Sequence, residues 1–199
     1  MSKKKIRRHY ELRIRDDAPG YRAADWSDRR AQELRFEVLV NNVALNGRSL
    51  LDVGCGTGDL WDFLRKRGIQ ADYLGVDLLD KMIEAACKRH PDARFLAIDI
   101  FQPDSLPGEL FDVVFASGVF NLDVGNNRDF LPRAIARLIE LSADTTVFNL
   151  LHARADVRHG HCVYWQPEDI RAMLTDFPGD VKALDDYLLN DFTVICRKR

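Results

Sequence analysis

The sequence predicts an α/β fold, in which a doubly wound and mostly parallel sheet has helices on both faces. Two observations favour this class. From residue 49 onward, short apolar runs alternate with segments of helical spacing, the pattern of parallel βαβ units with right-handed crossovers. Near the end of the chain, two β-branched and aromatic runs follow each other with no helix between them, which favours an antiparallel hairpin.

The expected elements can be placed in order. An extra N-terminal helix precedes the first strand; Asp25 or Ser27 can cap it, and Asn46 with Gly47 stops it. We expect the apolar stripe of this helix at Leu34, Val38 and Leu45. We expect Trp26, Arg30 and Arg35 to face a ligand or the solvent. Strands are expected at residues 49–54, 71–77, 93–99, 111–118 and 144–151. Helices are expected at residues 59–67, 79–89, 126–141 and 166–177, and the hairpin at residues 181–199.

Composition and charge narrow the class of protein. The 199 residues fit one domain with a sizeable core, and no apolar run reaches the roughly 18 to 20 residues that span a bilayer. The basic start is not followed by an apolar segment, as a secretory signal would be, so we expect a cytoplasmic protein with no membrane contact. Residues 1–15 hold seven Lys or Arg against one Glu, about +6, which leaves about −8 of the total −2 on residues 16–199.

This charge pattern predicts a basic, disordered tail at residues 1–15 and a single domain at residues 16–199. An acidic body repels phosphate backbones, so a small-molecule partner is expected, with a nucleic-acid clamp formed by the tail as the alternative. The four cysteines contain no C-x-x-C pair and are expected to be free thiols. His159, His161 and Cys162 have no obvious fourth ligand, so no metal site is expected.

The segment LLDVGCGTGDL, residues 50–60, ends the first strand. Ligands of open parallel sheets bind beyond the carboxyl ends of the strands, where the strand order reverses. Gly54, Gly56 and Gly58 allow positive φ and close approach of a ligand there, and the next helix offers unpaired N–H groups. The spacing is G-x-G-x-G instead of the G-x-G-x-x-G of a dinucleotide site, which argues against a nicotinamide oxidoreductase. Asp52 would repel a pyrophosphate and attract an ammonium group, so an adenosyl amino acid is favoured.

Aspartates also end the second and third strands. Asp77, nineteen residues after Gly58, can accept both hydroxyls of a ribose. Asp99, with Ile100 and Phe101 behind it, suits the exocyclic amine and the faces of adenine. One such aspartate often only caps the next helix, but three successive strands with an aspartate at or near the carboxyl end indicate one nucleoside site.

Four segments, LLDVGCGTGDL, YLGVDLLDKMIEAACKRHP, ARFLAIDI and FDVVFASGVFN, resemble the successive motifs of class I S-adenosylmethionine-dependent methyltransferases, from about Ser49 to the end. The segments GYRAADW and RAQELRF are similar to bacterial members of this superfamily. The resemblance implies a seven-stranded sheet with an antiparallel last strand, and S-adenosylmethionine as the cofactor.

The resemblance also implies the cofactor contacts. The first-strand loop is expected at the methionine part, the second-strand end at the ribose, the third-strand end at the adenine, and the fourth-strand end where the cofactor site opens onto the acceptor. The expected cofactor-binding residues are Asp52, Gly54, Cys55, Gly56, Gly58, Asp77, Leu78, Met82, Asp99, Ile100, Ser117 and Gly118.

The methyl acceptor is harder to infer. A sulfonium methyl is already activated, so transfer depends chiefly on placement, and a base is needed only for an acceptor of high pKa. The catalytic candidates follow the fourth and fifth strands: Asn121 could hold an acceptor or cap a turn, and His152 could be a base or a surface histidine. No NPPY or DPPY follows the fourth strand and no Pro-Cys nucleophile is present, which argues against DNA.

The sequence therefore predicts an S-adenosylmethionine-dependent methyltransferase that acts on a small molecule by in-line displacement, with Asp25–Leu45 as a partial lid. Two alternatives stay open. One is an RNA or protein methyltransferase guided by the basic tail, and the other is a catalytically inactive, cofactor-binding interaction module.

Overall fold

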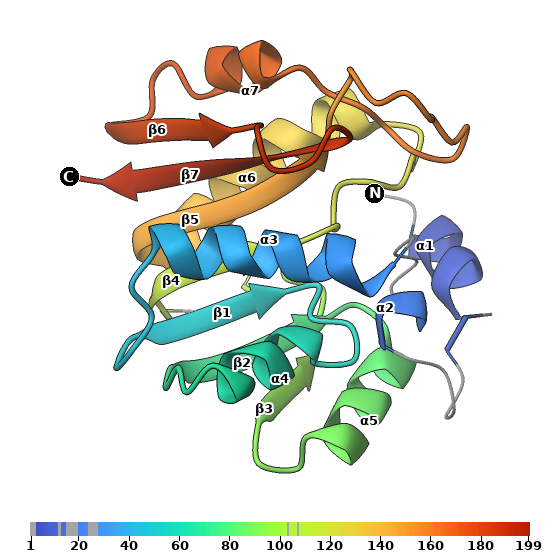
Figure 1. The fold of residues 1–199 in the computed structure, drawn as a ribbon, viewed down its shortest axis with the longest axis vertical. Coiled ribbons are helices and arrows are strands. Elements are labelled where there is room, and N and C mark those ends of the chain that lie inside the picture. The colour runs from blue at the N-terminus through green and yellow to red at the C-terminus, as the bar shows by residue number, and fades with distance from the viewer. Residues whose placement is uncertain (1–2, 12, 15–19, 24–27, 103, 107) are drawn as a thin grey trace.

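The computed structural model describes residues 3–11, 13–14, 20–23, 28–102, 104–106 and 108–199. One seven-stranded sheet has the order β3-β2-β1-β4-β5-β7-β6 (Figure 1). Its strands are β1 Ser49–Val53, β2 Asp72–Asp77, β3 Arg94–Ala97, β4 Phe111–Ala116, β5 Ser142–Leu151, β6 Gly179–Leu184 and β7 Asp191–Lys198. The first five pair in parallel, whereas β7 runs antiparallel to both β5 and β6. The expected doubly wound sheet and its terminal hairpin are confirmed.

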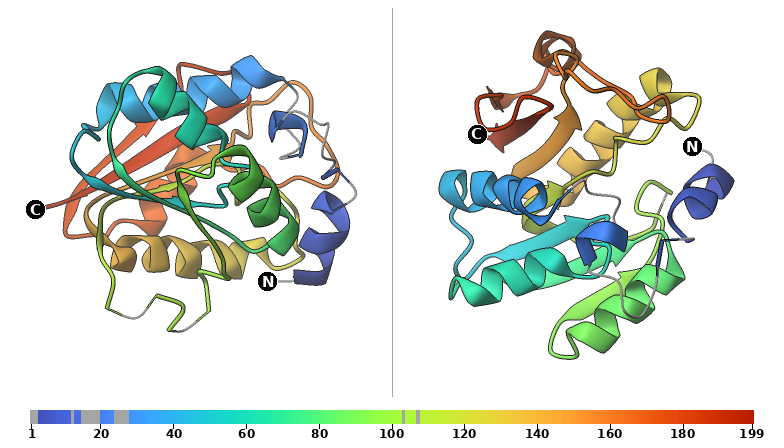
Figure 2. Two further views of the ribbon diagram at one scale, coloured as in Figure 1. Left: turned by 90° about the horizontal axis from the view of Figure 1, so that it is seen from below. Right: turned by 45° about the vertical axis from the view of Figure 1, so that its right-hand side comes forward.

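The helices cover both faces of this sheet. They are α1 Lys3–Tyr10, α2 Gly20–Ala23, α3 Arg29–Asn42, α4 Asp59–Lys66, α5 Asp80–Arg89, α6 Asn127–Leu141 and α7 Pro167–Met173. Figure 2 shows α3 and α4 on one side of the sheet and α6 on the other. Among the helices described, none is long and apolar enough to cross a membrane.

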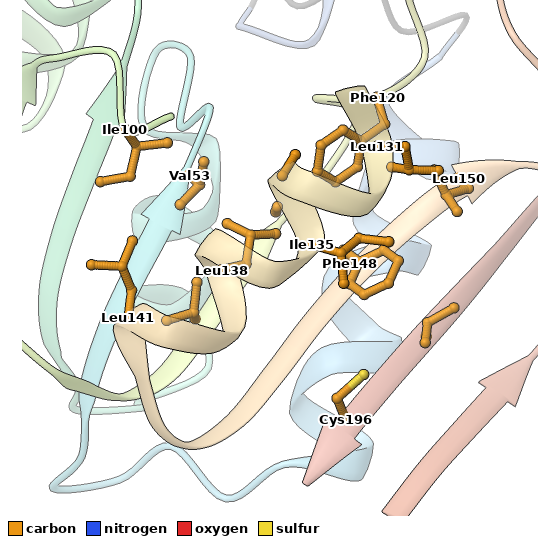
Figure 3. Packing of buried hydrophobic residues seen from close by; sticks show 14 of the residues in the cluster. Val53, Ile100, Phe120, Leu131, Ile135, Leu138, Leu141, Phe148, Leu150 and Cys196 are labelled. Carbon is orange, nitrogen blue, oxygen red and sulfur yellow. The ribbon is translucent and has the colours of Figure 1, made fainter. Parts of the chain in front are cut away.

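Strand alternation decides which residues meet which helices, because successive side chains point to opposite faces. Leu50 of β1 packs with the residues of α3 and α4, whereas its neighbour Leu51 packs with those of α6. Figure 3 shows Ile135 and Leu138 of α6 in the packing that includes Phe148 of β5. Both faces are therefore sealed by apolar contact, and the edge at the carboxyl ends of the strands is left for a ligand.

The helix before the first strand differs from the expectation. Asp28 caps α3, because its Oδ1 accepts a hydrogen bond of 2.7 Å from the backbone N–H of Ala31. The helix ends at Asn42, and the expected caps Asp25 and Ser27, together with Trp26, lie outside the described residues. The stripe that packs on the sheet contains Phe36 and Leu39, so the expected positions Leu34 and Val38 were wrong in register, whereas Leu45, beyond the end of the helix, is buried in the same cluster as expected.

Arg35 of α3 was expected to face solvent or a ligand, and that expectation was wrong. Its side chain is 2% exposed, and its Nε donates a hydrogen bond of 2.9 Å to Oδ2 of Asp191 in β7. Asp191 is fully buried. A buried guanidinium requires such a partner, since neither charge could be desolvated alone without a large cost.

The basic segment at the start forms the helix α1 over Lys3–Tyr10, where a disordered tail was expected. Its Ile6 and Tyr10 pack against Leu79 and Met82 at the start of α5. Figures 1 and 2 show α1 and α2 beyond the carboxyl end of β1. Apolar residues at helical spacing within the basic run give α1 a face that can be buried.

Candidate active site

A cavity opens at the carboxyl ends of β1 to β4 and encloses about 1080 Å³, open solvent at its mouth included. Every expected cofactor-binding residue except Gly58 lines it. The other described lining residues are Ile6, Tyr10, Gln32, Phe36, Val53, Asp59, Leu60, Val76, Leu79, Ile98, Phe101, Val119, Leu122 and Val124.

The glycine loop is shaped by backbone contacts. The N–H groups of Gly54 and Cys55 both donate to the carbonyl of Val76, at 2.8 and 3.0 Å, which ties the loop to the end of β2. Gly54 has φ of 72°, and a Cβ there would lie 2.5 Å from a methyl of Val119. Gly58 has φ of 82° and directly precedes α4. A Cβ at this position would clash with the rings of His90 and Phe95. Gly58 is therefore required by the turn and by packing, away from the cavity.

Asp77 is anchored by the same loop. Its Oδ2 accepts from the N–H of Gly56 at 3.1 Å, and its Oδ1 accepts from the N–H of Leu79 at 2.9 Å. Burial raises the pKa of Asp77 to about 6, against the lowering effect of these hydrogen bonds. Each carboxylate oxygen has a second lone pair, so Asp77 can also accept from the two hydroxyls of a ribose.

Asp52 is the most deeply buried carboxyl of the cavity lining, at 3% exposure. The hydroxyl of Tyr73 in β2 donates to its Oδ2 at 2.7 Å. The pKa of Asp52 is raised to about 7, chiefly by burial and also by the nearby carboxylates of Asp77 and Asp59, although the hydrogen bond from Tyr73 lowers it. A cation in the cavity would relieve this charge, as the ammonium or sulfonium group of an adenosyl amino acid would.

Tyr73 was not among the predicted site residues, although the alternation of buried and exposed positions in its strand contained the signal. Tyr73 pairs with Leu50 in the register of β1 and β2, so that Tyr73 and Asp52 lie on the same face of neighbouring strands. A tyrosine that is 3% exposed needs a hydrogen-bond partner for its hydroxyl.

Asp99 and Ile100 lie at the third strand end as expected. The Oδ1 of Asp99 accepts from the N–H of Phe101 at 3.1 Å. Its Oδ2 is 3.0 Å from Nζ of Lys3 in α1 and 3.2 Å from the side-chain amide of Gln102. The basic N-terminal helix therefore contacts the edge of the cavity where the adenine is expected.

Ser117 and Gly118 are held by a residue that the sequence analysis missed. Asn149 of β5 is fully buried; its Oδ1 accepts from the N–H of Gly118 at 2.9 Å, and its Nδ2 donates to Oγ of Ser117 at 3.1 Å. An asparagine within the otherwise apolar segment VFNLL was the available signal, because a buried amide must be hydrogen-bonded.

Asn121 lies in the loop that borders the cavity, but it is not one of the lining residues. Its N–H donates to the carbonyl of Gly118 at 3.3 Å, and its carbonyl accepts from Val163 at 2.9 Å. Its Oδ1 is buried and has no hydrogen-bond partner in the part of the chain that the structure describes. Asn121 stays a candidate for acceptor positioning.

His152 is not brought to the cavity. It is 4% exposed, its Nδ1 accepts from the N–H of Arg154 at 3.1 Å, and its Nε2 lies 3.7 Å from Asp185. Its ring meets Phe192 edge-on, with 5.3 Å between centroids. Burial and the charge of Arg154 lower its pKa. These contacts are those of a buried structural histidine, whereas a catalytic base or a surface histidine was expected.

Helices contribute lining that the sequence analysis did not assign to a ligand. Gln32 of α3 is 6% exposed, and its Nε2 donates to Oδ2 of Asp59 at 3.1 Å. Phe36 of the same helix also faces the cavity, so α3 forms a side wall. In the described part of the chain, no three His, Cys, Asp or Glu side chains are arranged to hold a metal.

Comparison with known proteins agrees with this geometry. Residues 50–142 match the model of a methyltransferase-domain family. Trans-aconitate 2-methyltransferase of Afipia carboxidovorans is 32% identical over 106 residues, which cover 49% of this chain and 40% of that protein. The putative methyltransferase Rv1506c of Mycobacterium tuberculosis is 29% identical over 160 residues, 75% of this chain and 93% of that protein. The match thus spans less than half the length of the trans-aconitate relative.

The fold agrees as well. The crystal structure of magnesium protoporphyrin IX methyltransferase from Synechocystis, with bound SAH, matches with a TM-score of 0.68 at 16% identity. The match covers 99% of this chain and 95% of that chain. Residues 50–142, which carry the glycine loop and the strand-end aspartates of the cavity, thus match a methyltransferase-domain family, and the fold of the whole chain is similar to that of the Synechocystis methyltransferase.

Proposed function

We propose that this protein transfers a methyl group from S-adenosylmethionine to a small-molecule acceptor by in-line displacement. The observation that carries the proposal is the convergence of the glycine loop with Asp52, Asp77 and Asp99 on one cavity. When bound, S-adenosylmethionine supplies an activated methyl group on a sulfonium, so the protein has to orient the reactants and exclude water.

The residues of the cavity fit this cofactor by their chemistry. Asp52 is a buried carboxyl whose charge is best satisfied by a cation, Asp77 offers paired acceptor oxygens to a ribose, and Asp99 offers an acceptor to an amine. The backbone around Ser117 and Gly118, held by Asn149, forms the wall toward the acceptor. Apolar side chains of α3 and of the loop after β4 would keep water from the reacting atoms.

A macromolecular acceptor guided by the basic segment has less support. Lys3, Lys5 and Arg7 of α1 each lie within 4 Å of a carboxylate of the body, at 3.0, 3.7 and 3.7 Å. Side chains engaged in this way offer less charge to phosphates. The curated relatives named for trans-aconitate act, by their name, on a small molecule, which further supports a small acceptor.

Calorimetric titration of the purified chain with S-adenosylmethionine, S-adenosylhomocysteine and NAD at matched ionic strength tests the cofactor assignment. Micromolar binding of the two adenosyl compounds and none of NAD is expected. Transfer of a labelled methyl group to small-molecule acceptors then tests catalysis. Absence of binding by both adenosyl compounds would refute the proposal, while binding without transfer to any acceptor would favour an inactive interaction module.

A further inference from the structure

The cavity carries a marked imbalance of charge. Its described lining includes four carboxylates, those of Asp52, Asp59, Asp77 and Asp99, and none of the described lining side chains is Lys, Arg or His. The remaining lining is mostly apolar. An anionic ligand would need a cation or a set of aimed N–H donors to offset its desolvation.

The nearest cations are engaged elsewhere. In α1, Lys3 contacts the edge carboxylate Asp99, while Lys5 and Arg7 contact Asp123 and Asp80 outside the cavity lining. The guanidinium of Arg35 in α3, which lies three residues after Gln32 and directly before Phe36 in the sequence, is bound to Asp191. Arg89 of α5, which is next to Asp59 through Thr57, donates to Oγ1 of Thr57 at 2.9 Å. Each of these five cations has a partner of its own, and none of them lines the cavity.

Asp59 is the carboxylate that we assign to the acceptor side of the cavity. The strand-end carboxylates Asp52, Asp77 and Asp99 are assigned to the cofactor, which leaves Asp59 as the fourth. The amide of Gln32 orients Asp59 at 3.1 Å, and Thr57 Oγ1 lies 3.4 Å from the same oxygen. The other carboxylate oxygen of Asp59 lies against Gly20 of α2, and the apolar side chain of Phe36 lines the same cavity.

From this lining we infer that the methyl acceptor is a neutral or cationic small molecule with an apolar body, an amine or an alcohol, and not a carboxylate. The inference rests on the proposed function and names the substrate class of the same site. It separates this chain from the relatives named for trans-aconitate, because a tricarboxylate would be repelled by the lining. Burial, with the charges of Asp77 and Asp59, raises the pKa of Asp52, as expected in a cavity of negative potential.

Binding of three probes that share one apolar body tests the inference. The purified full chain is first saturated with S-adenosylhomocysteine, and 3-phenylpropylamine, 3-phenylpropan-1-ol and 3-phenylpropanoate are then titrated at pH 7.5 by calorimetry, with trans-aconitate as a fourth probe. The amine is expected to bind about tenfold or more tightly than the carboxylate, with the alcohol between them and trans-aconitate not binding. Asp59→Asn is expected to narrow the gap between amine and carboxylate severalfold. The control Glu84→Gln, which removes an exposed carboxyl of α5 outside the lining, should leave it unchanged.

The outcomes separate the two proposals. Failure of S-adenosylhomocysteine to bind overturns the proposed function itself. If it binds, and the carboxylate or trans-aconitate binds as tightly as the amine, or neither the amine nor the alcohol binds, the inference about the acceptor is overturned while the cofactor assignment stands. The stated order of binding, weakened by Asp59→Asn and kept by the control, supports it.

Discussion

Replacing Asp52 by Asn should make the unliganded protein more stable near neutral pH, although the residue lies in the proposed active site. In the native state the carboxyl is 3% exposed, and burial raises its pKa from 3.8 to about 7. At pH values between these two pKa values, the carboxyl of Asp52 has lost its proton in the unfolded chain but retains it in the native state. Because the native pKa is the higher one, stability present below pH 4 is lost as the pH rises toward 7.

The structure sets the size of this effect. A shift of about three pKa units corresponds to about 4 kcal/mol at pH 7 and above, and to about 2 kcal/mol at pH 5. Asn keeps the shape of the neutral carboxyl, and its Oδ1 can still accept from the hydroxyl of Tyr73. The excess stability of Asp52→Asn over the parent should therefore grow by about 2 kcal/mol between pH 5 and pH 7.

Urea unfolding of both proteins at pH 5, 6 and 7, without cofactor, measures this difference. Asp176→Asn, which removes an exposed carboxyl from the turn after α7, is the matched control and should follow the parent at each pH. If the unfolding free energies of Asp52→Asn and the parent change in parallel from pH 5 to pH 7, the buried carboxylate of Asp52 does not destabilise the native state, and the prediction is refuted.

Four further outcomes follow from the same contacts. S-adenosylmethionine should bind more tightly as the pH rises from 6 to 8, because Asp52 and Asp77 ionise over this range; titrations in which affinity is flat or falls would contradict this. Asp77→Ala should weaken that binding by about 1 to 3 kcal/mol, and calorimetry equal to the parent's would show that the ribose is placed wrongly. Asn149→Ala should lower stability by about 1 to 3 kcal/mol and also weaken cofactor binding, since the backbone at Gly118 loses its partner; urea unfolding and titration report the two effects separately. Arg35→Met should cost about 3 to 5 kcal/mol of unfolding free energy by leaving the carboxylate of β7 unpaired, and a loss below 1 kcal/mol would refute the assigned ion pair.

Much of the fold could be predicted because its signal is periodic and local. Alternating apolar runs and helical segments place β1 to β5 and the helices between them within a few residues of their observed bounds. The aspartates at the strand ends were predictable for the same reason, since parallel strands bring their carboxyl ends to one edge. Asp52, Asp77 and Asp99 accordingly line one cavity.

The misplaced predictions share a different physical basis. Arg35 and His152, which were misplaced, and Asn149, which was missed, are polar residues whose roles depend on partners far away in the chain, such as Asp191 for Arg35 at a separation of 156 residues. Helical spacing alone could not separate a buried, paired arginine from an exposed one. Likewise, the charge of residues 1–15 predicted a tail, whereas Ile6 and Tyr10 pack against Leu79 and Met82, which lie about 70 residues further along the chain.

The sequence by itself determined the fold class, the glycine loop and the three strand-end carboxylates, because strand alternation, turn chemistry and sheet polarity act over a few residues. Only the tertiary structure decided that Tyr73 donates to Asp52, that Asn149 holds the turn at Gly118, and that the cavity lining described here has carboxylates without cations. These features arise where separate elements meet, and burial there makes each unpaired charge or hydrogen bond costly enough to matter.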